Sequence, residues 1–114
     1  MAAVTPEDVR AYLEMQTADL YRLLVPSDEK ELYGRGAVIA RGQSILRVQS
    51  KAIRRVVCPK IGAKLDTLDM GVLIATSIAA DPNLGRLPAL PLTALLLKIG
   101  LDSFCDEGSD LGLA

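Results

Sequence analysis

Residues 37–57 read AVIARGQSILRVQSKAIRRVV, a stretch without proline in which apolar residues recur at three- and four-residue steps. This spacing is typical of an amphipathic helix, and the apolar positions cover about half of the helical wheel. The apolar side is centred on Val38, Ile45, Val48, Ala52 and Val56, and is flanked by Ile39, Leu46, Ile53 and Val57. Arg47, Lys51, Arg54 and Arg55 lie opposite. The stretch therefore predicts a long helix that packs one face on a core and carries cations on the other.

The two ends of this helix carry different signals. Cys58 precedes Pro59, and a residue before proline is disfavoured in the helical region, so the helix should end there. Upstream, Asp28 and Glu31 have the spacing of a capping box, whereas Gly34, Gly36 and Gly42 each weaken a helix by up to about 1 kcal/mol relative to alanine. We expect either a kink near residues 34–36 or a short helix followed by a longer one.

Three further helices are predicted. The first covers residues 6–24, with Thr5 as the N-cap and Pro6 at the first helical position. The third in chain order covers residues 68–80, with Asp66 or Thr67 as its cap. It contains small side chains such as Gly71, which indicate that another helix crosses closely. The fourth covers residues 92–104, after a short extended piece between Pro88 and Pro91. Its apolar residues point in nearly all directions, which is typical of a buried helix or of one that binds a partner.

The sequence therefore predicts an all-α fold, a small four-helix bundle-like domain with a long second helix that is either kinked or preceded by a short helix. Its 114 residues suit one domain with one core. We place that domain at residues 1–105 and predict that the acidic tail at residues 106–114 is disordered.

Charge is separated along the chain, although 13 Lys and Arg nearly balance 14 Asp and Glu. Residues 1–31 carry a balance of −4, residues 32–64 hold eight bases and no acid, and residues 65–114 carry a balance of −5. A near-neutral sum thus hides three blocks of alternating sign. Either the acidic blocks fold over the basic one, or the basic block faces outward for a partner.

The residues needed for most catalytic and metal sites are missing. The chain has no histidine, which excludes Ser-His and Cys-His nucleophile pairs and imidazole ligands. Two cysteines alone cannot complete a zinc site, and the paired carboxylates fall at predicted helix ends, where they act as caps. We expect no cofactor and no metal.

Two surfaces are candidates for binding. The first is a basic stripe formed by Arg47, Lys51, Arg54, Arg55, Lys60 and Lys64, which fits an acidic protein surface, a second copy of the chain, or nucleic acid phosphates. The alternative is an exposed face neutralised by the chain's own acids. The second candidate is an apolar interface formed by Leu92, Leu95, Leu96 and Ile99. Its alternative is an ordinary core helix.

These observations favour a non-enzymatic protein–protein interaction module, an adaptor or accessory subunit. A nucleic-acid-binding regulator is the alternative, and a small enzyme that depends on Cys58 is the least favoured. No secretory signal or transmembrane stretch is visible, which predicts a cytoplasmic location with reduced thiols at Cys58 and Cys105. A bridge between these cysteines is conceivable only if two helix ends meet in space.

Overall fold

The computed structural model describes residues 4–30, 32, 34–62 and 64–105, and within these ranges it contains helices and no strand. The predicted all-α fold is confirmed. In chain order the elements are α1 (Pro6–Leu13), α2 (Thr17–Leu24), α3 (Ser27–Lys30), α4 (Arg35–Val57), the 3-10 turn η1 (Cys58–Lys60), α5 (Thr67–Ala80), α6 (Ala89–Ile99) and α7 (Leu101–Cys105). The predicted tail at residues 106–114 lies outside the described residues.

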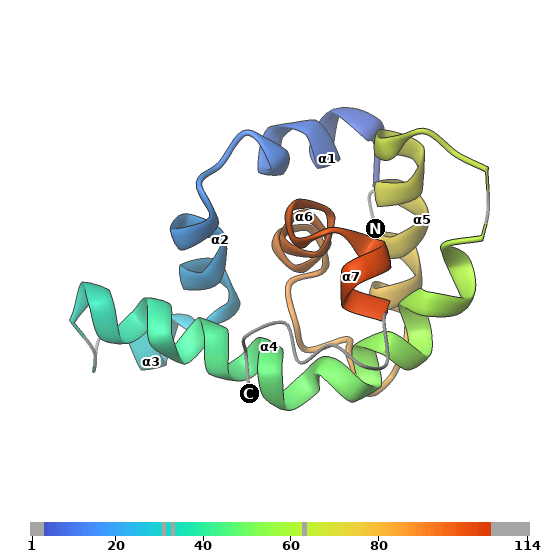
Figure 1. Cartoon of the computed structure of the whole chain (residues 1–114). Helices are drawn as coiled ribbons and strands as arrows, with labels where there is room; N and C mark the ends of the chain where they lie inside the picture. Colours follow the sequence, from blue (N-terminus) through green and yellow to red (C-terminus); the bar gives the residue numbers. More distant parts are fainter. Residues whose placement is uncertain (1–3, 31, 33, 63, 106–114) are drawn as a thin grey trace.

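Helix α6 occupies the centre of the fold. Figure 1 shows it nearly end-on, with α1, α2, α4 and α5 arranged around it. It packs against α1, α2 and α5, and Leu92, Leu95 and Leu96 are completely buried. An all-round apolar helix is stable here because neighbours remove every one of these side chains from water.

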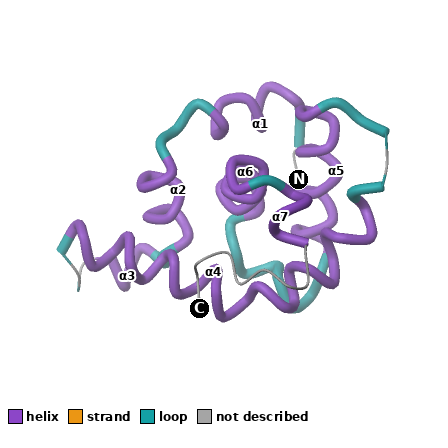
Figure 2. Tube along the Cα trace, in the orientation of Figure 1, coloured by secondary structure: helices purple, strands orange, loops and turns teal. Residues whose placement is uncertain are grey.

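The predicted first helix is two helices. Its start is confirmed, because the Thr5 hydroxyl accepts a hydrogen bond from the Asp8 N–H at 3.2 Å and the Asp8 carboxylate accepts one from the Thr5 N–H at 3.1 Å. The chain then leaves the helical path after Leu13 and resumes at Thr17. Both segments pack on α6 from different sides, and one straight helix could not follow that curved path (Figure 2).

Of the two expected starts for the long helix, the short helix followed by a longer one is confirmed. Helix α3 ends at Lys30, and α4 begins at Arg35 with Gly34 as its N-cap. The helix then runs to Val57 and passes directly into η1, which holds Pro59.

The apolar face of α4 is rotated relative to the prediction. The buried residues are Val38, Gly42, Leu46, Ile53 and Val57, whereas Val48, predicted near the centre of the face, is 70% exposed. The reason is Gly42: a Cβ there would overlap the backbone carbonyl oxygen of Tyr21, so α2 lies directly on this glycine. Tyr21 itself is buried, and this burial raises the pKa of its phenol.

The C-terminal helices confirm one prediction and correct another. Helix α5 starts where expected, since the Asp66 carboxylate accepts a hydrogen bond from the Asp69 N–H at 2.8 Å. Gly71 is the predicted close crossing, with Val9 of α1 against it. The predicted helix over residues 92–104 is wrong in two respects. It begins at Ala89, and it breaks at Gly100, whose φ of 101° turns the chain into α7.

Among the described residues, no helix combines the length and the apolar character needed to cross a bilayer.

Candidate interaction surface

The solvent-facing side of α4 carries cations along its second half. Arg47, Lys51 and Arg55 follow one another at one-turn spacing and are exposed. Lys60 in η1 and Lys64 in the following loop are also exposed. We call Lys51, Arg55, Lys60 and Lys64 the basic face. None of the four forms an ion pair with a described acidic side chain.

Arg54, another member of the predicted stripe, has a role inside the fold. Its Nε–H donates a hydrogen bond to the Phe104 carbonyl at 2.8 Å, and its guanidinium lies 5.2 Å from the centre of the Phe104 ring. Arg54 therefore fixes α7 against α4, because it both caps a carbonyl and stacks on a ring. Arg47 is exposed but already has an interaction partner, so it is not counted in the basic face.

The acidic blocks neutralise little of the basic block in the described part of the chain. The ion pairs there are Arg41–Glu29, at 3.1 Å, and Arg22–Asp19, at 3.5 Å. Only the first joins the basic block to an acidic one. Several of the described acids are instead used locally, as Asp8, Asp66 and Asp81 are in caps and turns. The basic face thus points to solvent, and none of its four cations is paired with a described acid.

The predicted apolar interface on α6 is wrong for the folded chain. Leu92, Leu95 and Leu96 have no exposed surface, and Ile99 is half-buried beside the core. The sequence correctly indicated a helix that needs apolar neighbours on all sides. The chain's own helices supply them, so these leucines are unavailable to a partner.

The two cysteines are joined in a disulfide, which corrects the expectation of reduced thiols. Cys58 stands at the end of α4 and Cys105 at the end of α7, with their Cα atoms 5.7 Å apart. The turn at Gly100 makes this possible, because it directs α7 back toward α4. A thiolate nucleophile at Cys58 is therefore absent from this state of the protein.

An open groove of about 530 Å³ adjoins the basic face. One wall comes from the end of α4 and η1, with Arg55, Pro59 and Lys60, and the other from the C-terminal half of α5 and the turn after it. The sequence did not predict the α5 wall, which consists of Thr76, Ser77, Ala80, Asp81 and Pro82. The small side chains near the end of α5 were the available signal, but we interpreted them only as a helix crossing.

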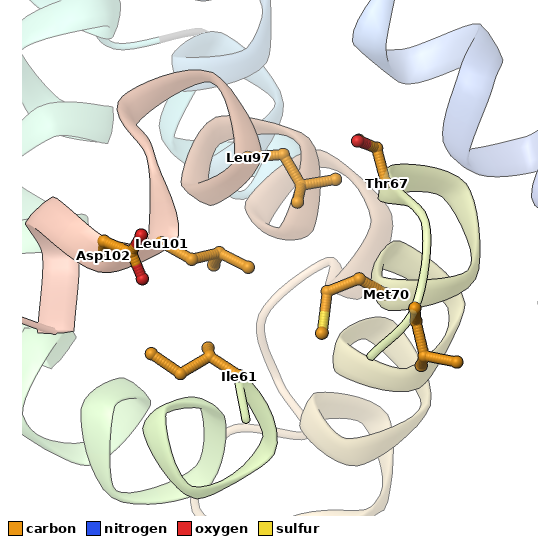
Figure 3. Close-up of a pocket in the computed structure, with 7 residues that line it drawn as sticks. Ile61, Thr67, Met70, Leu97, Leu101 and Asp102 are labelled. Carbon is orange, nitrogen blue, oxygen red and sulfur yellow. The ribbon is translucent and has the colours of Figure 1, made fainter. Parts of the chain in front are cut away.

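A second cavity, of about 300 Å³, lies between the loop before α5 and the start of α7. Figure 3 shows the side chains of Ile61, Met70, Leu97 and Leu101 around this space, with Thr67 and Asp102 at its edge. Most of its described lining residues are apolar, but the space is open to solvent and polar atoms make up more than half of its exposed surface. It is a hollow at the edge of the core, where α6 packs on both α5 and α7.

Comparison of the chain with family models, with curated proteins and with solved structures finds no match. The described residues also contain no group of three Asp, Glu or Cys side chains that could hold a metal ion.

Proposed function

We propose that this chain is a non-enzymatic interaction module, an adaptor or accessory subunit, that binds an acidic segment of a partner protein through its basic face. The observation that carries this proposal is the availability of Lys51, Arg55, Lys60 and Lys64, which are exposed and have no ion pair with a described acid. Clustered cations of this kind steer an acidic partner and fix its orientation.

An acidic protein fits this surface better than nucleic acid does. Proteins that bind single strands stack bases on exposed aromatic rings, but no aromatic residue belongs to the basic face, and the chain's one phenylalanine, Phe104, is completely buried. The nucleic-acid-binding alternative therefore rests on the cations alone.

A second copy of the chain could supply the same acidic chemistry from residues 1–31, which carry a balance of −4. Light scattering over a concentration series separates this case from a different partner. A mass that doubles at low salt and returns to the monomer at high salt would identify self-association.

The cellular location of the chain must be consistent with the disulfide. The sequence predicts the cytoplasm, where thiols are normally kept reduced, whereas the Cys58–Cys105 bridge favours an oxidising compartment. We propose the latter. Alkylating free thiols in native cells before extraction, followed by mass spectrometry, would test it: blocked cysteines would indicate the cytoplasmic location instead.

Binding to two model polyanions tests the proposed function. We would measure the affinity for poly-L-glutamate and for a DNA duplex by fluorescence anisotropy at low salt. Replacing Lys51 and Arg55 with glutamine together should weaken polyglutamate binding about five- to ten-fold, because two exposed charge contacts are lost. The matched control replaces Arg86 and Lys98 with glutamine, which removes the same charge from exposed positions outside the basic face.

Two outcomes would overturn the proposal. One is equal weakening by the two double variants, which would mean that net charge and not the basic face determines binding. The other is a duplex affinity clearly above that for polyglutamate, which would favour the nucleic-acid-binding alternative.

A further inference from the structure

The groove between α4 and α5 lies where the basic face ends. Lys51 precedes Arg55 by one helical turn, and Arg55 and Lys60 both line the groove. Figure 1 shows why this site forms: α5 runs back toward the end of α4, so that the last turns of the two helices meet. A segment bound along the basic face would therefore extend into the groove.

The groove combines charge on one wall with apolar surface. Arg55 and Lys60 supply the charge, while Val56, Ala80 and Pro82 supply apolar atoms. Ala80 and Pro82 are exposed, and their short side chains leave the space of about 530 Å³ unfilled. A site of this volume accepts a large side chain, and apolar anchors in such sites dominate binding energy at interfaces.

The one acid among the described residues that line the groove, Asp81, forms hydrogen bonds within its own turn. One oxygen of the Asp81 carboxylate accepts hydrogen bonds from the Asn83 N–H at 2.8 Å and from the Leu84 N–H at 3.2 Å. These bonds stabilise the turn after α5 and hold that oxygen toward the backbone. Among the described lining residues, the two cations on the opposite wall therefore outnumber this one carboxylate.

We propose that this groove receives one large apolar side chain from the acidic segment of the partner, while flanking carboxylates of that segment contact Lys51, Arg55 and Lys60. This inference rests on the proposed function and adds to it, because it specifies the chemistry of the partner: an acidic peptide with an apolar anchor. Nucleic acid fits less well, since none of the described residues that line the groove is aromatic.

Three acidic probes separate the two proposals. They are poly-L-glutamate, a short glutamate peptide with one central leucine, and the same peptide with glutamine in place of the leucine. The leucine peptide should bind about ten-fold more tightly than the glutamine peptide, because burial of a leucine side chain has roughly that effect on affinity. All binding should weaken with salt.

A neutral change within the groove provides the matched test. Ala80→Gln fills the groove with a polar side chain without changing the net charge, and should abolish the preference for leucine while polyglutamate binding stays the same. Ala79→Gln places the same side chain on the same exposed end of α5 but outside the groove lining, and should change neither. Both positions are exposed, so both variants should fold.

The outcomes are distinct. Polyglutamate binding without a leucine preference would overturn the groove proposal and leave the proposed function standing. A leucine preference that survives Ala80→Gln would place the anchor elsewhere and overturn the groove proposal as well. Absence of binding to all three probes at low salt would overturn both.

Discussion

Helices α4 and α6 were both predicted to bind partners, yet the fold uses them in opposite ways. Helix α6 is surrounded by other helices, and three of its leucines are completely buried. Helix α4 lies along the outside, with Lys51 and Arg55 exposed and Val48 70% exposed. The difference shows that the chain buries the apolar side chains of α6 in its own core, whereas the cationic side chains of α4 stay exposed to solvent.

The physical reason is the different cost of burial. Removing apolar surface from water is favourable, so a 114-residue chain with few aromatic side chains places its most apolar helix at the centre. Burying an unpaired Lys or Arg costs much more than it returns, so the cationic side of α4 must stay in water. Apolar surplus is therefore a weak indicator of an interface in a small protein, and an unpaired cluster of charges is a better one.

The largest difference in stability should appear when an aspartate is introduced into each helix in turn. Leu95→Asp puts a charge at a position with no exposed surface, and we expect loss of the cooperative unfolding transition, because the penalty of several kcal/mol approaches the stability of a small domain. Val48→Asp on α4 should change the free energy of unfolding by less than about 0.5 kcal/mol. Circular dichroism during urea denaturation measures both.

The comparison between α4 and α6 would fail if the two aspartate variants behaved alike. A folded Leu95→Asp protein would show that α6 can leave the core and reach solvent. A strongly destabilised Val48→Asp protein would show that the side of α4 containing Val48 is covered.

The second largest effect concerns the link between these helices. The Cys58–Cys105 disulfide joins the end of α4 to α7, the continuation of α6, and the two cysteines are 47 residues apart in sequence. Replacing both cysteines with serine should lower the free energy of unfolding by about 4 kcal/mol in the chain-entropy model. The decrease should match that of the wild-type protein in reductant, and equal urea midpoints with and without reductant would contradict it.

A smaller effect should follow from the glycine contact that orients α4. Gly42→Ala places a methyl group against the Tyr21 carbonyl oxygen, a backbone atom that cannot move without shifting α2, and should cost about 1–3 kcal/mol. Gly36→Ala is the control, because nothing lies within 4 Å of the added Cβ in the same helix. It should stabilise the protein by about 0.5–1 kcal/mol. If both variants gained stability in thermal unfolding, the contact would not be what rotates α4.

Gly42 also illustrates how far the sequence could predict this structure. Local signals were sufficient for the cap at Thr5, the cap at Asp66 and the end of α4 before Pro59, because each depends on neighbours in the chain. The rotation of α4 depends on Tyr21, and the disulfide depends on the turn at Gly100, so both needed contacts between distant residues. For the candidate site, the cations were visible in the sequence, but the α5 wall of the groove was not.

The smallest predicted effect tests whether the centre of the fold is as dry as its burial indicates. Thr93 of α6 is completely buried, and its hydroxyl has no hydrogen-bond partner among the described residues. Valine has nearly the same shape and no hydroxyl, so Thr93→Val should raise the free energy of unfolding by about 1 kcal/mol, the cost of an unsatisfied buried polar group. The control is Thr76→Val on the exposed side of α5, which should be near neutral. A destabilised Thr93→Val protein in urea denaturation would mean that the hydroxyl is satisfied, for instance by a buried water. The core around α6 would then hold a water molecule, and the burial of α6 would not exclude all solvent from it.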